Sequence, residues 1–321
     1  MTVLIAGGGI GGLTLALSLH QVGIPCRVFE SVPELKPLGV GINVLPHAVR
    51  ELIELGLIDQ LSAFGVATAE LAYFSKRGKP IWSEPRGLAA GYKWPQFSIH
   101  RGVLQQILYD ATLDRLGADS VLTSHHLRDW QETGNGVRAT FIDRATGKTA
   151  GSYDGALLIA ADGIHSAVRE KLYPNEGPPL WNGRILWRGI TEADAFLTGR
   201  TMIMAGHESL KFVCYPISNA PLANGKHLIN WVAERLLDPD YRWRREDYNR
   251  TAKRDEFLPW FEDWRFDWLD VPGLIRNCKH AYEYPLVDRD PLDQWSFGRV
   301  TLMGDAAHPM YPIGSNGASQ A

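Results

Sequence analysis

The sequence predicts an α/β protein in two parts, a mostly parallel sheet with helices and a second, mostly antiparallel sheet. Short apolar runs at 3–6, 156–161 and 300–303, the last interrupted by Thr301, are typical of parallel strands that are buried on both faces. From about residue 180 to 284 the texture changes to longer alternating segments, whose turns carry Gly, Asn and Pro. That pattern favours antiparallel strands.

The first element is a predicted βαβ unit. Val3-Leu4-Ile5-Ala6 forms the first strand, residues 13–22 form a Leu- and Ala-rich helix that Gly23 ends, and residues 26–29 form the second strand. A helix that begins near Gly11 follows the glycine-rich turn directly.

The next segments alternate between helical and strand patterns. Apolar spacing predicts one helix over 47–64 and another over 102–116. Between them, 70–75 and 80–82 flank Lys76-Arg77-Gly78-Lys79, which is typical of a β-hairpin. Residues 137–142 and 152–153 are expected to form further antiparallel strands that interrupt the α/β pattern.

The second part is expected to contain strands at 201–205, 212–217 and 228–234, followed by a charged helix over 244–266. At the end of the sequence, 317–321 is expected to begin a helix. We therefore expect the C-terminal helices of the fold to be missing from this sequence.

Composition excludes several classes of protein. The chain has 321 residues, 45% hydrophobic and 21% charged, with a net charge of −3, so a basic surface for nucleic acid is not expected. Three scattered cysteines predict neither a disulfide framework nor a metal site and favour the cytoplasm. The sequence shows no signal peptide and no apolar stretch long enough to span a membrane.

The turn after the first strand carries the spacing GxGxxG at Gly7, Gly9 and Gly12. These glycines permit a tight turn, close approach of a pyrophosphate and close helix–strand packing, and the helix N-terminus favours phosphate. Glu30 ends the next strand, where a carboxylate can accept hydrogen bonds from ribose hydroxyls. Because a 2′-phosphate would be repelled there, the site is predicted to hold FAD or NAD rather than NADP.

Three further charged residues stand at the ends of strands. Arg101 begins a helix, where its guanidinium can contact phosphate or ribityl oxygens, although a surface ion pair is the plainer alternative. Asp162 and Asp305 follow buried strands, at the edge where α/β sheets bind ligands, and a turn or capping role remains open for Asp162.

With these residues in place, the chain resembles the class A flavoprotein aromatic monooxygenases, the para-hydroxybenzoate and salicylate hydroxylase group, over nearly its whole length. The motifs that carry the resemblance are Gly7-Gly8-Gly9-Ile10-Gly11-Gly12 with Glu30, Ala161-Asp162-Gly163-Ile164-His165-Ser166, and Gly304-Asp305-Ala306-Ala307-His308. Segments such as Pro37–Asn43 and Tyr284–Pro291 look most like the phenazine hydroxylase branch.

The resemblance implies roles for individual residues. Glu30 would hold the FAD ribose, Arg101 the pyrophosphate or ribityl chain, Asp305 the ribityl chain, and Asp162 both FAD and the nicotinamide. No side-chain base is assigned. The remaining expected cofactor contacts are Leu13, Val40, Gly41, Leu127, Gly317 and Ala318, with Pro312 beside the reactive carbon of the flavin.

The resemblance also implies the reaction, while the domain division follows from the strand pattern and the absence of a metal from the scattered histidines. NADH or NADPH would reduce FAD, O2 would form a flavin hydroperoxide, and an electron-rich aromatic ring would be hydroxylated. The protein would be a monomer or a homodimer without a metal. The FAD-binding domain is expected at 1–68, 98–179 and 285–321, and the substrate domain at 69–97 and 180–284.

The antiparallel region and the last loop supply candidate substrate contacts, for which core packing is the competing interpretation. They are Trp187, Met204, Tyr215, Trp231 and Tyr311. Two alternatives to hydroxylation remain open. One is another FAD-dependent oxidoreductase (a dehydrogenase, an epoxidase or a halogenase), and the other is a non-catalytic FAD-binding fragment.

Overall fold

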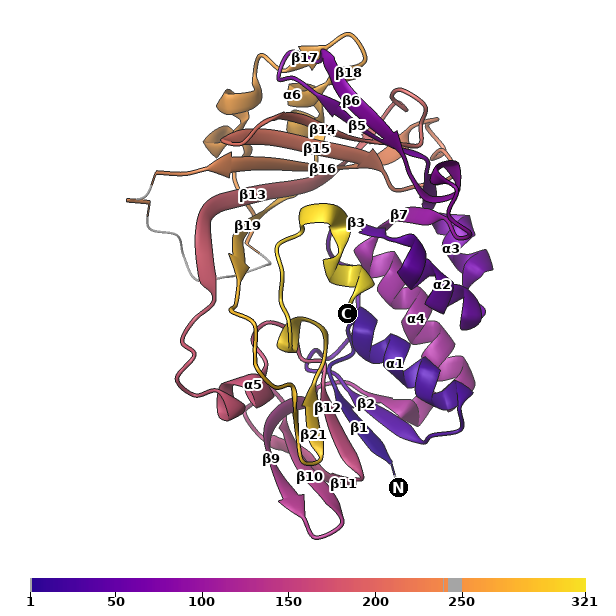
Figure 1. The fold of residues 1–321 in the computed structure, drawn as a ribbon, viewed down its shortest axis with the longest axis vertical. Coiled ribbons are helices and arrows are strands. Elements are labelled where there is room, and N and C mark those ends of the chain that lie inside the picture. Colours follow the sequence, from indigo (N-terminus) through magenta and orange to yellow (C-terminus); the bar gives the residue numbers. More distant parts are fainter. Residues whose placement is uncertain (1, 239, 242–249) are drawn as a thin grey trace.

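The chain folds into two halves, one around a parallel sheet and the other around a large mixed sheet (Figure 1). The structure is a computed structural model that describes residues 2–238, 240–241 and 250–321. The last residues run between the halves, so that the C-terminus lies beside the first helix. No helix in these described ranges is long and apolar enough to cross a membrane.

The first half is built on a six-stranded sheet in the order β20-β21-β12-β1-β2-β8, parallel except for β20. Its strands are β1 (Val3–Ala6), β2 (Cys26–Phe29), β8 (Val121–Leu122), β12 (Leu157–Ala160), β20 (Ser296–Phe297) and β21 (Val300–Leu302). The expected βαβ unit is confirmed, with α1 at Ile10–Gln21. The helix begins earlier than its apolar spacing alone predicts, because the glycine turn leads straight into its first turn.

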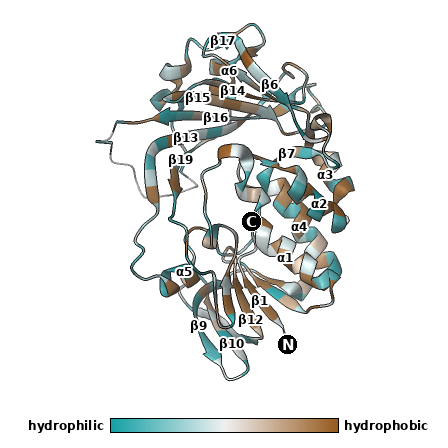
Figure 2. Ribbon diagram, viewed as in Figure 1, coloured by the Kyte–Doolittle hydropathy of each residue, from teal (hydrophilic) through white to brown (hydrophobic). Residues whose placement is uncertain are grey.

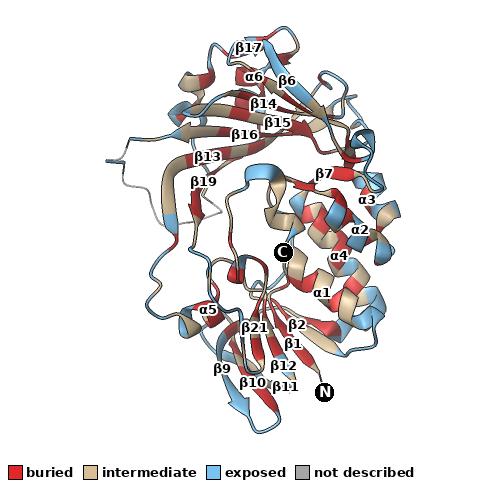
Figure 3. Cartoon of the chain, in the orientation of Figure 1, coloured by how far each residue is buried: buried red, intermediate tan, exposed pale blue. Residues whose placement is uncertain are grey.

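The two faces of this sheet are covered differently. Val3 and Ile5 pack toward helices, with α1 joined by α2 (Pro46–Glu54), α3 (Ile58–Phe64) and α4 (Arg101–Leu116). Leu4 and Ala6 face the antiparallel meander β9 (His126–Thr133), β10 (Gly136–Ile142) and β11 (Thr149–Gly155), with α5 (Ala167–Leu172) beside it. Because both faces are covered, β1 is hydrophobic and buried along its whole length, and Leu158 and Ala160 of β12 are buried as well (Figures 2 and 3).

The second half is a seven-stranded sheet in the order β19-β13-β16-β15-β14-β5-β6. All its pairs are antiparallel except β14 with β5. The strands are β5 (Glu70–Phe74), β6 (Pro80–Pro85), β13 (Leu180–Ala193), β14 (Thr201–His207), β15 (Leu210–Pro216), β16 (His227–Leu236) and β19 (Ala281–Asp288). The predicted hairpin and the three predicted strands of this part are therefore confirmed.

One face of this sheet forms an aromatic core under α6 (Val271–Asn277) and the small ribbon of β17 (Arg265–Phe266) and β18 (Leu269–Asp270). Trp187 stacks on Phe257 with ring centroids 4.9 Å apart. Trp231 is fully buried, its indole N–H donates to Thr191, and Gly189 leaves room for its ring. The face that carries these tryptophans is called the core face below, and the opposite face, toward the first half, the inner face.

A short sheet of β3 (Gly41–Val44), β7 (Gln96–His100) and β4 (Val66–Thr68) lies between the halves. β3 contacts the C-terminal segment, whose last 3-10 turn is Gly317–Ser319 rather than the α-helix start expected there. The backbone N–H of Leu45 donates to the Ser319 hydroxyl at 3.0 Å. The end of the chain is thereby tied to the middle of the molecule.

One predicted helix is confirmed only as two shorter helices, and another is wrong. The helix over 47–64 is split in two, because the chain turns at Gly56 with φ of +71°, where Leu57 N–H bonds back to the Leu52 carbonyl. The charged helix over 244–266 is replaced, in its described part from 250, by two 3-10 turns at 254–256 and 258–261 and by β17. Residues 244–249 of that prediction lie outside the described residues.

Candidate functional site

The three strand ends predicted to carry cofactor motifs lie side by side. β1 pairs with β12, and β12 pairs with β21. Gly7 follows β1 and lies against the Ala161 carbonyl, which a Cβ at Gly7 would approach to 2.2 Å. Met303 N–H donates to the Ala160 carbonyl at 2.9 Å. Glycines and carboxylates about 150 residues apart therefore meet at one edge of the sheet.

The glycine turn has the space that each position of the motif requires. Gly7 has φ of +111°, and a Cβ at Gly12 would lie 2.0 Å from the Gly7 carbonyl oxygen, so both positions exclude a side chain. A Cβ at Gly9 would meet nothing within 4 Å. The open space lies at the N-terminus of α1, where free N–H groups favour a phosphate. Gln105 on α4 fixes the turn by donating to the Gly8 carbonyl at 2.8 Å.

Glu30 is buried at the end of β2 and faces this turn. One carboxylate oxygen accepts the Gly8 N–H at 2.7 Å, and the other accepts from Ser31 and from the Val32 N–H. Each carboxylate oxygen has more than one acceptor position, so the group retains capacity for a ribose hydroxyl. Glu30 thus both holds the turn and offers acceptors beside it.

Arg101 begins α4 as predicted, and its backbone N–H donates to the Val40 carbonyl at 2.9 Å. Within the described ranges its exposed guanidinium makes no ion pair. Asp305 lies close enough for Arg101 to affect its titration. Desolvation raises the pKa of Asp305, whereas the charges of His308 and Arg101 oppose that rise. The structure therefore brings a cation and a carboxylate together beyond the glycine turn.

Asp162 follows β12 and is only half satisfied. Its Oδ2 accepts the Ala167 N–H at 2.9 Å, while its buried Oδ1 has no hydrogen-bond partner in the described part of the chain. Burial raises its pKa, and hydrogen bonds from Ser166 and the backbone offset that rise only in part. A buried acceptor without a donor is costly and suits a site where a ligand hydroxyl or amide completes the bond.

The pH dependence of stability tests this burial. Because the folded pKa of Asp162 lies above its ordinary value of 3.8, the native state binds the proton more tightly than the unfolded chain does. In cofactor-free protein, we therefore expect the unfolding free energy of the wild type, relative to Asp162→Asn, to fall as pH rises above 4. Urea denaturation at a series of pH values measures how the unfolding free energy of each protein changes with pH. Any pH-independent effect of the asparagine substitution on stability does not alter that slope.

Asp154 is the control for that measurement, because the hydrogen bond from Arg138 lowers its pKa. Relative to Asp154→Asn, the wild type should be more stable at pH values above the ordinary pKa of an aspartate. That extra stability should be lost as pH falls through the lowered pKa of Asp154 in the folded protein. Equal slopes for wild type and Asp162→Asn would contradict the assigned desolvation.

The backbone of Gly41 is hydrogen-bonded by side chains from the inner face of the large sheet. Its N–H donates to Asn230 Oδ1 at 2.7 Å, and its carbonyl accepts from Arg188 Nη2 at 2.8 Å and Tyr215 Oη at 2.9 Å. A Cβ at this position would lie 2.7 Å from Asn230. Desolvation raises the pKa of Tyr215 to about 12, so the hydroxyl stays a donor at neutral pH. Arg188 and Asn230 were missed from sequence because nothing local marks them.

The last loop lies beside Gly41. The 3-10 turn that contains Gly317 and Ala318 contacts β3, the strand that begins at Gly41. Pro312 is exposed in the loop before it. The Tyr311 hydroxyl bonds Asp288. Desolvation, together with the charge and hydrogen bond of Asp288, raises the pKa of Tyr311 to about 12.

The other predicted contacts separate by sheet face. Met204 and Tyr215 lie on the inner face, whereas Trp187 and Trp231 pack in the core face and do not join them. Leu13 and Leu127 are buried in the cores on either side of the parallel sheet. Neither side chain is exposed to a cofactor.

A buried arginine behind the site links two of the motifs. Arg169 on α5 is 1% exposed and donates to the carbonyls of Ala306 and Ala307 at 3.1 and 2.9 Å. It also pairs with Glu176, which Arg289 contacts at 2.8 Å. Burial alone would raise the pKa of Glu176, but the two arginines outweigh it and hold that pKa below its usual value.

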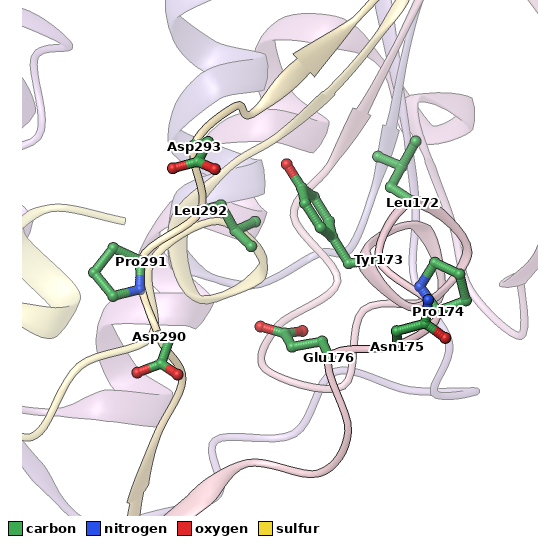
Figure 4. A pocket seen from close by; sticks show the side chains of 9 residues that line it. All are labelled: Leu172, Tyr173, Pro174, Asn175, Glu176, Asp290, Pro291, Leu292 and Asp293. Atoms are coloured by element: carbon green, nitrogen blue, oxygen red, sulfur yellow. The ribbon is translucent and has the colours of Figure 1, made fainter.

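A surface depression of about 420 Å³ lies beyond this network, with Tyr173 and Glu176 on one side and Asp290 and Asp293 on the other (Figure 4). None of the predicted site residues lines it. The described residues contain no group of His, Cys, Asp and Glu that could hold a metal ion.

The residues at the sheet edge fit a flavin dinucleotide. Gly9 leaves space at a helix N-terminus for a pyrophosphate, Glu30 offers acceptors for a ribose, and Arg101 has no acid partner within ion-pair distance among the residues that the structure describes. The buried Oδ1 of Asp162, which has no hydrogen-bond partner among the described residues, can accept a hydrogen bond from a ligand. Such a set is suited to a long ligand with phosphate, hydroxyl and amide groups.

Comparisons with known proteins agree with this geometry. A family model described as "FAD binding domain" matches residues 1–178. The phenazine 1,6-dicarboxylic acid hydroxylase of Lysobacter antibioticus is 48% identical and covers 99% of this chain and 79% of its own length. The 3-hydroxybenzoate 6-hydroxylase 1 of Aquipseudomonas alcaligenes is 30% identical, with 99% and 77% covered.

The fold is shared with a solved structure. HpxO of Klebsiella pneumoniae, crystallised with FAD and uric acid, superposes with a TM-score of 0.78 at 28% identity. The alignment covers 100% of this chain and 76% of that one.

Proposed function

The chain belongs to the FAD-dependent aromatic monooxygenases, and from that premise we propose that it hydroxylates a phenazine- or salicylate-like aromatic ring with NADH or NADPH and O2. The observation that supports the site assignment best is the convergence of the Gly9 space, Glu30, Asp162 and Asp305 at one sheet edge. The phenazine part rests on the 48% identity to the Lysobacter enzyme, which acts on a phenazine dicarboxylic acid.

The proposed cofactor contacts follow the order of the site. The pyrophosphate would lie over Gly9 at the N-terminus of α1, with the adenosine ribose at Glu30. Arg101 and Asp305 would hold the pyrophosphate and ribityl chain, and Asp162 Oδ1 would accept from the ribityl chain or the nicotinamide. The flavin ring would lie along Val40-Gly41, near Pro312, Gly317 and Ala318.

FAD, when bound, supplies the oxygen chemistry of the reaction. The chain's own residues orient the ring and exclude water. Tyr215 stays protonated and directs its hydroxyl to Gly41, which fixes the strand on which the flavin would rest. Met204 lies on the same inner face and offers an apolar wall. Trp187 and Trp231 are left out of the proposed substrate site because they stabilise the core face.

The alternatives are less well supported. The relatives reported above are named as hydroxylases, which favours oxygen insertion over dehydrogenation or halogenation. We also propose the division into an FAD-binding domain and a substrate domain. The large sheet of the second domain takes its strands from 70–85 and 180–288, so β19 extends past the expected domain boundary at 284. We also propose a cytoplasmic monomer or homodimer, since the three cysteines are free thiols.

A substrate panel tests the proposed activity. FAD-loaded protein is expected to oxidise NADH or NADPH faster when phenazine-1-carboxylate or salicylate is added, and to release a hydroxylated product. Under ¹⁸O2 the product should gain one labelled oxygen, which separates hydroxylation from dehydrogenation and halogenation. Protein that binds FAD but inserts oxygen into no member of the panel would falsify the proposal, and nicotinamide oxidation without product does not support it.

A further inference from the structure

His100 lies at the junction between the strand along which the flavin would lie and the helix that Arg101 begins. It ends β7, pairs with Gly41 of β3 and directly precedes α4. Its ring is half-buried and bonds to both neighbouring segments. Because Gly41 and Arg101 are both proposed cofactor contacts, the state of this ring bears on the cofactor site.

The ring caps the first turn of α4. Nδ1 of His100 accepts the backbone N–H of Gly102 at 3.1 Å, as an N-cap side chain does. Because Nδ1 accepts, the neutral ring carries its proton on Nε2, the nitrogen that is left to bond the Gly39 backbone. One side chain therefore connects the start of α4 to the segment before β3, and it does so in a single tautomer of the neutral ring.

The segment before β3 lies directly against the start of α4. A Cβ at Gly102 would lie 2.3 Å from the Pro37 carbonyl carbon. A Cβ at Gly39, where φ is +110°, would lie 3.8 Å from the Cβ of Arg101. The position of Arg101 is thus set together with that of this segment, and the His100 ring bonds to both sides of the contact.

Protonation of the ring is incompatible with this arrangement. Both nitrogens of an imidazolium are donors, so a protonated Nδ1 would face the Gly102 N–H with a second N–H. The cation would also lie at the positive end of the α4 dipole. Desolvation lowers the pKa of His100 below its ordinary value of 6.5; the bond to Gly39 opposes this change, and the charge of Arg101 adds to it.

Among the described residues, Arg101 is the charged side chain that acts on the titration of this ring. β3, which pairs with His100, carries no ionisable side chain. Ionisable side chains on the other neighbouring elements have partners of their own: Lys36 with Glu34, Arg188 with the Gly41 carbonyl and the Tyr284 ring, Tyr215 with the same carbonyl, and Asp305 with the charges of Arg101 and His308. These groups are unchanged in variants of His100, so their titration cancels in a comparison of such variants with the wild type.

We propose that His100 is a positioning residue of the FAD site, whose neutral ring holds Arg101 and residues 37–40 in the arrangement that binds the cofactor and whose protonation releases them. This role rests on the proposed function, because the contacts of Arg101, Val40 and Gly41 with FAD are part of it. It adds a proton-dependent control of cofactor binding to the site. Acid should therefore weaken FAD binding through this one ring.

The pH dependence of FAD affinity tests this role. The dissociation constant is measured by fluorescence titration of the cofactor-free full chain with FAD, for the wild type and His100→Asn, from about pH 4.5 to about pH 8. Asparagine keeps an acceptor where Nδ1 lies but does not titrate, so it should bind FAD within about threefold of the wild type at the upper end. At the lower end the wild type should bind FAD roughly threefold to thirtyfold more weakly than His100→Asn, as for loss of an N-cap.

Protein stability provides a second readout that needs no cofactor. Because the folded pKa of His100 is lowered, the unfolded chain binds the proton more tightly than the native state does. Relative to His100→Asn, the wild type should have its full unfolding free energy above the ordinary value of 6.5 and lose part of it as pH falls toward the lowered pKa. Urea denaturation of the two cofactor-free proteins measures this difference at each pH.

Three further variants separate the cap from other effects. His100→Ala removes the cap without leaving a titrating group, so its FAD affinity should be reduced at every pH. His20→Asn replaces an exposed histidine in the last turn of α1 and should reproduce the wild-type pH profile. Arg101→Gln should weaken FAD binding over the whole range, because it removes the proposed charged contact. Melting temperature shows whether each variant is folded.

The outcomes are distinguishable. If the ratio of the dissociation constants of wild type and His100→Asn is the same at every pH, or if His100→Ala binds FAD as tightly as the wild type, the positioning role is overturned while the proposed function stands. If Arg101→Gln binds FAD as the wild type does, the cofactor contacts of the proposed function fail, and the role of His100 fails with them. A loss of affinity in acid that His20→Asn retains and His100→Asn lacks supports the proton-dependent control.

Discussion

Alanine at Gly9 is expected to leave the cofactor-free protein folded and to weaken FAD binding roughly tenfold to a hundredfold. A Cβ at Gly9 meets no protein atom within 4 Å, so its only effect is to occupy the space at the N-terminus of α1. Overlap of one methyl group in a well-packed site typically costs about 1–3 kcal/mol, which corresponds to that range of affinity. Fluorescence titration of FAD, with urea denaturation of the cofactor-free protein, measures both quantities.

Gly12→Ala is the contrasting variant. Its Cβ would lie 2.0 Å from the Gly7 carbonyl oxygen, which is backbone and cannot rotate away. We therefore expect it to destabilise the cofactor-free protein itself by roughly 2–3 kcal/mol or more. The placement of the pyrophosphate is contradicted if Gly9→Ala binds FAD as the wild type does, or if it unfolds as readily as Gly12→Ala.

Replacing Arg169 by methionine is expected to destabilise the protein by about 3–5 kcal/mol, the usual cost of breaking a buried ion pair from one side. Arg169 is 1% exposed, and the variant would leave the Ala306 and Ala307 carbonyls without this donor. Glu176 would keep Arg289 but lose its nearer cation. Because these carbonyls follow Asp305 directly, FAD affinity should fall together with the melting temperature.

Arg138→Met serves as the matched control, since Arg138 pairs with Asp154 on an exposed strand pair. An exposed ion pair contributes little to stability, so its melting temperature should stay close to that of the wild type. Differential scanning fluorimetry and FAD titration compare the two variants. An Arg169→Met protein that matched the wild type in both measurements would rule out a bracing role for this arginine.

Much of the first half could be predicted because its signals are local. The apolar run of β1, the glycines after it and Glu30 lie within one βαβ unit, and the motifs at Asp162 and Asp305 each follow a short apolar strand. Local patterns are sufficient to define such units. The rule that ligands bind at the carboxyl ends of parallel strands then brings distant motifs together.

The misses have tertiary causes. The helix over 47–64 has good apolar spacing on both sides of Gly56, but the chain turns there and Arg115 holds the Leu55 carbonyl. In the described part of 244–266, aromatic side chains pack together under the large sheet from two 3-10 turns and a short strand instead of from one helix. Arg188 and Asn230 meet Gly41 only through pairing of segments 147 and 189 residues away, which no local pattern indicates.

The order of strands in the parallel sheet has a consequence for synthesis on the ribosome. β12 pairs on one side with β1, which is made early, and on the other with β21, which is made almost last. At typical translation rates the roughly 140 residues between these two strands take on the order of 7–30 s to emerge. During that time one hydrogen-bonding edge of β12 has no partner, so we expect the nascent chain to depend on chaperones until Val300–Leu302 is added.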